Sequence, residues 1–150
     1  MTYPQEKISE AISRFSVPVQ FNTAEPTDEI QRRAKEFRQI WTPTFIWLTP
    51  DGFELRRKIG YFPAEELRAE FDMARGFAAY VQKDYEKAAQ LFASVEKEFS
   101  DVPAASEGLY WAGVAELLNG SKQGLMKNWK KLQHNYSDSE WWTRASFIAG

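Results

Sequence analysis

The sequence predicts a fold in two parts, an α+β part followed by an all-α part built from helical hairpins. The first observation is a pair of strand-forming segments, TFIWLT (44–49) and FELRRKI (53–59), on either side of a Pro-Asp-Gly turn. This arrangement is typical of a β-hairpin. The second is that the pattern becomes purely helical after Gly76. The third is a repeat with a period of 37 residues in the second half, which indicates stacked helical hairpins.

The composition is that of a folded chain, and it excludes several classes of chemistry. Hydrophobic residues make up 43% and the formal net charge is −2, so nothing indicates disorder or binding to nucleic acid. The absence of cysteine removes disulfides, thiolate nucleophiles and cysteine-based metal sites. We therefore expect no enzyme activity, no metal and no cofactor. No signal-peptide pattern opens the chain and no apolar run approaches the ~18 residues of a membrane span, so we expect a cytoplasmic protein without membrane contact.

The first part contains three predicted helices and about three predicted strands. A helix is expected from Pro4 to about residue 14, followed by a short strand over VPVQFN, residues 17–22. Thr27 suits the N-cap of a second helix, since its hydroxyl can accept from an amide of the first turn. The hairpin 44–59 comes next, and a third helix starts near Pro63. We place a soft domain boundary near residue 76, because that third helix is expected to continue into the second part.

The second part repeats its sequence in register. With the 37-residue offset, Gly76 matches Gly113 and then Gly150, and Phe92 matches Trp129. The glycines are expected to let two helices approach closely, and the large side chains to fill the space between hairpins. Helices are expected up to about residue 82 and then over 85–99, 103–118, 121–135 and from about 139.

Residues 77–150 resemble the tetratricopeptide family, with two units and a capping helix. Tyr85, Ala88 and Phe92 match the family's spacing, although the usual period is 34 and serines replace the usual proline. The resemblance implies a groove that binds a peptide or protein segment, with Tyr80, Tyr110 and Leu117 as candidate groove residues. Two interpretations of Trp141 and Trp142 stay open. They either enlarge the contact of a capping helix or present an exposed aromatic ring to a partner.

The segments TYPQEKISEAISRFSVPVQFN and WTPTFIWLTPDGFELRRKIGYFPAEEL resemble the thioredoxin-like superfamily, over residues 2–76. The resemblance implies that Pro43 follows a cis peptide bond and that the backbone of Thr42 pairs with an extended peptide. It also implies that Gly60 keeps the neighbouring surface open. The family's first core strand and its Cys-x-x-Cys precede this region, and Met1 stands a few residues past the expected second cysteine. No catalytic residue can therefore be carried over.

The absence of that core strand predicts an incomplete thioredoxin-like domain. The strand would lie between segment 17–22 and the hairpin, so its loss leaves an apolar strand edge open. We expect either a rearranged three-stranded sheet, which we favour, or a homodimer through the open edge.

These observations favour a non-catalytic module that binds a protein or peptide. The alternative is the C-terminal part of a thiol:disulfide oxidoreductase whose Cys-x-x-Cys lies upstream of Met1. A third hypothesis is a structural protein that associates with its own kind.

Overall fold

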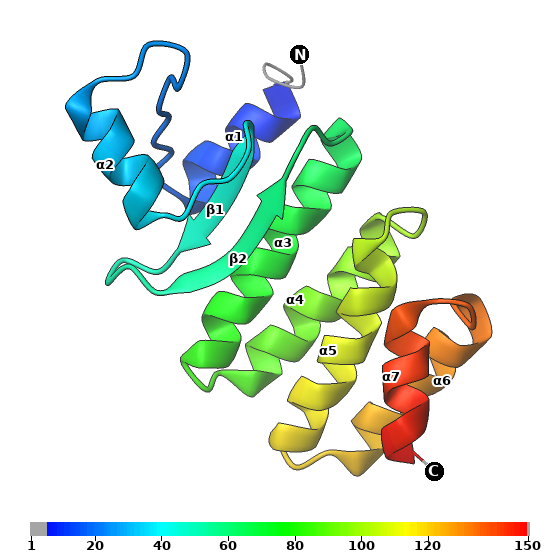
Figure 1. Ribbon diagram of the computed structural model, residues 1–150. Helices are drawn as coiled ribbons and strands as arrows, with labels where there is room; N and C mark the ends of the chain where they lie inside the picture. Colours follow the sequence, from blue (N-terminus) through cyan, green and yellow to red (C-terminus); the bar gives the residue numbers. More distant parts are fainter. Residues whose placement is uncertain (1–5, 150) are drawn as a thin grey trace. The chain divides into compact units, whose positions relative to one another are not determined.

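A computed structural model of the chain describes residues 6–149, which form seven helices and one two-stranded antiparallel sheet (Figure 1). The chain divides into two compact units, Met1–Ala64 and Glu65–Gly150. The division lies at the start of α3 (Ala64–Val81), whereas the sequence placed a soft boundary near residue 76. The helix that crosses residue 76 is continuous, as expected, but all of it except Ala64 belongs to the second unit.

The helices of unit 1 are α1 (Glu6–Phe15) and α2 (Asp28–Glu36). The predicted start of the first helix, Pro4, lies outside the described residues. Thr27 caps α2, because its hydroxyl accepts a hydrogen bond of 3.3 Å from the amide of Ile30. Two acidic side chains in the first turn suit the positive end of the helix dipole. The predicted N-cap is therefore confirmed.

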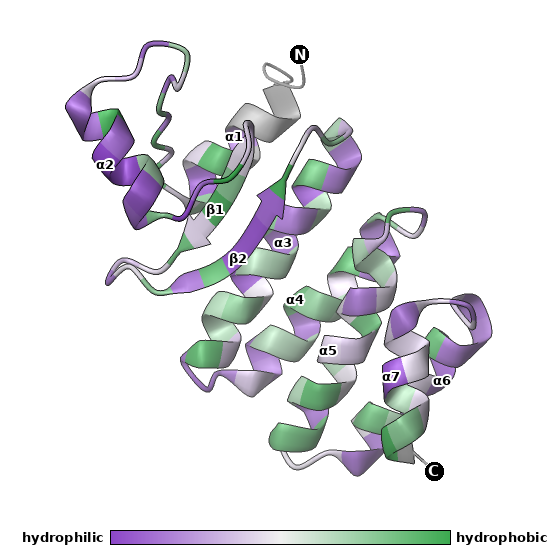
Figure 2. Ribbon diagram, viewed as in Figure 1, coloured by the Kyte–Doolittle hydropathy of each residue, from purple (hydrophilic) through white to green (hydrophobic). Residues whose placement is uncertain are grey.

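The sheet of unit 1 is the predicted hairpin, formed by β1 (Thr44–Leu48) and β2 (Glu54–Ile59). The strands pair antiparallel with Thr44 opposite Ile59 and Ile46 opposite Arg57. Gly52 occupies the turn with a positive φ of 88°, which an L side chain rarely adopts. Figure 2 shows β2 largely in hydrophilic colours, in keeping with its sequence ELRRKI beside TFIWL in β1.

The expected strand over 17–22 does not form, and this part of the prediction was wrong. The segment has no regular secondary structure, and its backbone makes no hydrogen bond within the described residues. Val17 and Val19 are 88% and 72% exposed. A strand exists only through its ladder with a neighbour, and in the described part of the chain β1 pairs with β2 alone. The rearranged three-stranded sheet is therefore not formed.

Unit 2 is a series of antiparallel helices: α3, α4 (Tyr85–Glu98), α5 (Ala104–Leu118), α6 (Lys122–Asn135) and α7 (Glu140–Ala149). Each of α4 and α6 contacts α5, and α7 contacts both α5 and α6. Asp84 and Ser121 cap α4 and α6 by accepting from amides of the first turn. The predicted order of helices after residue 82 is confirmed.

The repeat has a direct structural counterpart in the contacts of its glycines. A Cβ atom added at Gly76 would overlap the ring of Phe92, and one added at Gly113 would lie 2.6 Å from the ring of Trp129. Both separations are too short for a real Cβ, so only glycine fits. This confirms the close approach expected at the glycines, and it shows that the large residue of each of the first two repeats is the group that approaches them. The third match, Gly150, lies outside the described residues.

Candidate functional site

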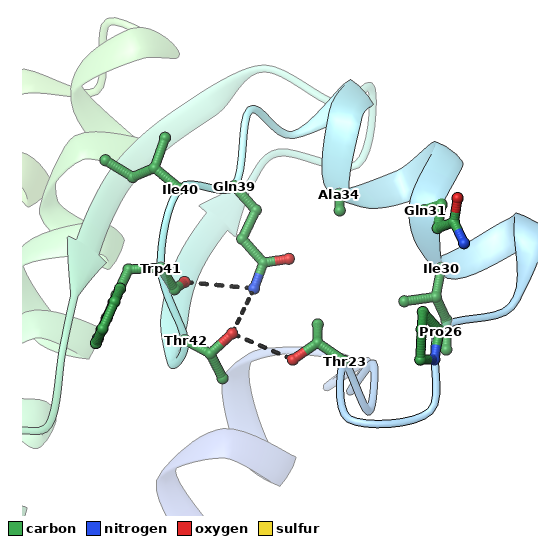
Figure 3. A pocket seen from close by; sticks show the side chains of 9 residues that line it. All are labelled: Thr23, Pro26, Ile30, Gln31, Ala34, Gln39, Ile40, Trp41 and Thr42. Atoms are coloured by element: carbon green, nitrogen blue, oxygen red, sulfur yellow. Dashed lines mark hydrogen bonds between the residues drawn. The ribbon is translucent and has the colours of Figure 1, made fainter.

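Unit 1 contains an open, mainly apolar hollow of about 460 Å³ next to the loop that precedes β1 (Figure 3). Helix α2 forms one wall, the loop ahead of it the floor, and the segment before Pro43 the other wall. The lining residues are Thr23, Pro26, Ile30, Gln31, Ala34, Gln39, Ile40, Trp41 and Thr42. A second hollow of about 160 Å³ shares five of these residues and reaches further along β1, to Pro43, Thr44 and Ile46.

A network of side-chain hydrogen bonds fixes the loop between the two hollows (Figure 3). The Nε2 group of Gln39 donates to the carbonyl of Trp41 at 3.3 Å and to the hydroxyl of Thr42 at 3.0 Å. The hydroxyls of Thr42 and Thr23 are 3.1 Å apart, and the hydroxyl of Thr44 donates to the carbonyl of Trp41 at 2.6 Å. These bonds use the side chain of Thr42 and leave its main chain free.

The structure brings together the three residues to which the resemblance assigned a peptide site. The peptide bond between Thr42 and Pro43 is cis, as the resemblance implied. The amide of Gly60 donates to the carbonyl of Pro43 at 2.9 Å. Nothing lies within 4 Å of a Cβ placed on Gly60, so the surface beside it is open.

The edge of β1 that faces away from β2 carries unpaired main-chain groups. Because Gly60 and Pro43 form a hydrogen-bonded pair, Thr44 and Ile46 fall at the alternate positions of the ladder. Their N–H and C=O groups therefore point away from β2. The main-chain groups of Thr42 form no hydrogen bond among the described residues either. Three alternating residues thus present strand-pairing groups in a row, and all three line the second hollow.

The second hollow carries little charge, because Arg33 is the one charged residue among those that line it. The Nη1 group of Arg33 donates to Glu36 at 3.1 Å. Its Nε is enclosed and has no partner among the described residues. The other walls are apolar or uncharged, so the hollow favours uncharged side chains.

The predicted groove residues of unit 2 are for the most part packed against one another. The ring of Tyr110 stacks on Trp129 at 5.5 Å and lies 5.1 Å from Trp141. Trp142 packs against the same cluster, as a half-buried residue. These contacts agree with the interpretation of Trp141 and Trp142 as part of a capping helix.

Two further groove candidates differ in exposure. Tyr80 lies 5.7 Å from Trp111 and 5.5 Å from Tyr85. Burial raises the pKa of its hydroxyl, and Tyr85 and Tyr110 add to the shift. Leu117, in contrast, is 41% exposed at the end of α5. The structure thus brings Tyr80 together with the aromatic core and leaves Leu117 apart from it.

Metal-ligating side chains are not gathered at one place in the described residues. No group of three or more His, Asp or Glu side chains in residues 6–149 is arranged to hold a metal ion. The sequence contains no cysteine. None of the helices described is both long and apolar enough to cross a membrane.

No family model, curated protein or solved structure matches the chain. The two resemblances therefore stay expectations, and function has to be argued from geometry. Sequence reasoning singled out Thr42, Pro43 and Gly60 but not Thr44 and Ile46. The resemblance implied an open strand edge beside the hairpin, but the sequence did not show that Thr44 and Ile46 would carry its free main-chain groups.

Proposed function

We propose that this protein is a non-catalytic interaction module that binds an extended polypeptide segment along the free edge of β1. The observation that carries the proposal is the row of unpaired main-chain groups at Thr42, Thr44 and Ile46 beside two hollows. An extended segment that adds to a sheet edge gains main-chain hydrogen bonds, and pockets for alternate side chains give it specificity.

The residues along the two sheet edges support β1, and not β2, as the edge that binds the peptide. Both strands have an unpaired edge among the described residues. The outer strand β2 carries Arg56, Arg57 and Lys58, and charged residues on an edge discourage strand addition. The edge of β1 is uncharged at Thr42, Thr44 and Ile46 and lies beside the hollows, which favour uncharged side chains.

The packing of unit 2 supports the same choice of site. Most of the residues expected in a helical groove pack against the core of the unit: Tyr80, Tyr110, Trp141 and Trp142. These rings are half-buried, so their packing takes up part of the surface that a ligand would use. The main-chain groups at the edge of β1 are not used in this way.

The alternative of an oxidoreductase fragment rests on the resemblance alone. The given sequence contains no thiol, so a reactive cysteine would have to come from sequence outside it. The thioredoxin-like and tetratricopeptide-like assignments are kept as proposals on the same footing.

The test uses a pair of proline variants that differ only in the edge they block. Ile46→Pro removes an N–H that points away from β2, and Ile59→Pro removes the equivalent N–H on the outer edge of β2. Neither change removes a ladder hydrogen bond within the hairpin. A phage-displayed library of short peptides is selected against the full chain, and the affinities of selected peptides are measured by fluorescence anisotropy.

We expect Ile46→Pro to weaken binding by at least ~tenfold, about 1.4 kcal/mol, and Ile59→Pro to leave it unchanged. Circular dichroism checks that both variants fold. Equal affinity of a selected peptide for the two variants would refute the proposal. Amide protection caused by the bound peptide in α3–α7, and not in β1, would refute it as well.

A further inference from the structure

We propose that the segment that pairs with β1 comes from a second copy of this chain, as residues 17–22, VPVQFN. Two copies would exchange these segments reciprocally, each adding a strand to the sheet of the other. This inference rests on the proposed function, because it names the occupant of the same edge.

The segment has the properties of a strand without a partner. Val17, Val19 and Phe21 alternate along it and are all exposed, and none of its backbone groups is hydrogen-bonded within the described residues. Alternating β-branched and aromatic residues favour pairing in a sheet. The same chain therefore presents an unpaired strand-forming segment and an unpaired strand edge, and the two do not pair with each other.

Proline at position 18 decides which side of the segment can face β1. Proline has no N–H to donate to a ladder, so in a sheet its N side must face away from the neighbouring strand. The main-chain groups that point toward β1 are then those of Val17, Val19 and Phe21. The groups of Pro18 and Gln20 point to the other side. The exchanged strand is thus suited to lie at the edge of the combined sheet.

The segment borders the same hollow as the free edge of β1 but does not pair with that edge. Gln20, Phe21 and Thr23 line the second hollow opposite Thr42, Thr44 and Ile46. The hydrogen bond between the hydroxyls of Thr23 and Thr42 holds the end of the segment at the start of the edge. The hollow itself separates the segment from β1, and a strand from outside can fill it.

A second copy also supplies enough apolar surface for a specific interface. Besides the exposed residues of the segment, Ile40 and Trp41 are 79% and 67% exposed at the wall of the first hollow. In a two-fold dimer the same apolar patch is buried on each of the two copies. Covering these side chains in both copies removes on the order of 1,000 Å² of surface, about the lower limit for a specific interface. The lining is nearly uncharged, so two identical surfaces can meet without repulsion.

The first experiment measures the mass of the full chain by light scattering over a range of concentrations, with two proline variants. Val19→Pro removes an N–H that faces β1 of the other copy, whereas Gln20→Pro removes one that faces away. Both residues are exposed and lie in a segment without backbone hydrogen bonds, so neither change disturbs the fold of a single copy.

We expect the wild type and Gln20→Pro to have twice the 17.4 kDa mass of the chain. Val19→Pro is expected to raise the dissociation constant of the dimer by at least ~tenfold. A wild type that stays monomeric at all concentrations would overturn the inference, and so would a Val19→Pro variant that dimerises normally.

The second experiment locates the contact, and it uses the absence of native cysteine. Val19→Cys is combined in turn with Thr42→Cys, Thr44→Cys or Ile46→Cys, and each protein is oxidised and run on a non-reducing gel. Disulfides between copies in at least one pair, beyond those of the single Val19→Cys control, support the exchange. Disulfides only within one copy overturn it, because they show that the segment closes on its own sheet.

The failure of this inference can be told apart from the failure of the proposed function. If the wild type is monomeric but selected peptides bind it and Ile46→Pro weakens them, the edge is a site for another protein and the second copy is excluded. If the wild type is monomeric and no peptide distinguishes Ile46→Pro from Ile59→Pro, both proposals fail.

Discussion

Unit 1 and unit 2 differ sharply in how much apolar surface they bury. Among the described residues, Ile12 is the one fully buried hydrophobic side chain of unit 1, and the other eighteen belong to unit 2. Unit 1 instead exposes large apolar residues along its segment 17–21 and its loop 40–41. Unit 2 fills its interior with rings and small residues that fit one another.

This difference supports unit 1 as the half to which we assign the proposed binding site. A two-stranded sheet is marginally stable in water, and a unit of about 60 residues buries a smaller share of its surface than a larger domain does. Added main-chain hydrogen bonds and apolar contacts at β1 would therefore stabilise unit 1 more than any surface contact would stabilise unit 2. The site proposed for binding lies in the unit that gains most from it.

The largest expected effect tests whether the core of unit 2 stabilises that unit by itself. Phe92 is completely buried and meets Gly76 and the ring of Phe77, 5.0 Å away. Phe92→Ala leaves a cavity and should lower the free energy of unfolding of unit 2 by about 3–5 kcal/mol. Amide hydrogen exchange with mass spectrometry reports each unit separately.

The matched control is Gln90→Ala, an exposed position of the same helix. It should change the stability of unit 2 little, and protection in β1 and β2 should be the same in both variants. An equal loss of protection in the hairpin would contradict the division into two independently stabilised units.

The next effect tests the fit between repeats. Gly113→Ala places a Cβ against Trp129, and such overpacking should destabilise unit 2 by about 1–3 kcal/mol. Combining it with Trp129→Phe, which makes room, should cost less than the two single changes added together. Chemical denaturation of the four proteins measures this coupling. Strict additivity would show that the two residues do not act on each other.

The helices of unit 2 could be predicted well from the sequence because their determinants are local. A helix makes its hydrogen bonds within its own segment, so periodicity and caps placed α4, α5 and α6 within one or two residues. The offset that matched Gly76 with Gly113 and Phe92 with Trp129 also picked out residues that meet in the structure, Gly76 with Phe92 and Gly113 with Trp129. The boundary near residue 76 was less informative, because a continuous helix shows no change in composition.

The strand at 17–22 could not be predicted reliably, because a strand depends on a distant partner. The alternation of Val17, Val19 and Phe21 says that the segment can pair, but not that a neighbour exists within the chain. The candidate site shares this limit. Thr42 was found through a resemblance, whereas Thr44 and Ile46 matter only because the edge beside them is open. Groove and core residues likewise share one helical pattern, so Tyr110 was indistinguishable from a ligand contact.

A smaller effect at high pH concerns unit 2 alone. The hydroxyl of Tyr136 donates to the carbonyl of Ser100 at 2.9 Å. Burial raises its pKa above the usual 10.0, and the carboxylates of Glu96 and Asp101 add to the shift. The folded state therefore holds this proton more tightly than the unfolded state does. The stability that the protonated hydroxyl contributes is present below pH 10 and is lost as the pH rises through the folded pKa.

Tyr136→Phe should reduce this alkaline loss, leaving the part due to Tyr80, whose pKa is also raised, and should cost about 1 kcal/mol at neutral pH, because one hydrogen bond is removed. Exchange-detected stability of unit 2 between neutral and alkaline pH measures both quantities. Tyr61→Phe, at an exposed position in unit 1, is the control and should leave the alkaline loss in place. A Tyr136→Phe variant with the pH profile of the wild type would contradict the assignment.

The smallest effect, at low pH, concerns unit 1 alone. Two nitrogens of Arg57 donate to the carboxylate of Glu54 at 2.8 and 2.6 Å, and these bonds lower the pKa of Glu54 below its usual 4.5. The contribution of the pair is present above pH 4.5 and is lost as the pH falls through the folded pKa. Because the pair is partly exposed, it should be worth roughly 0.5 kcal/mol. Glu54→Gln should reduce the acid dependence of amide exchange in the hairpin, and Glu140→Gln in α7 should not. Part of the dependence remains with Asp51, whose hydrogen bond with Thr49 also lowers its pKa. Loss of protection in unit 2 over the same acid range, with the hairpin unaffected, would reverse the comparison between the two units.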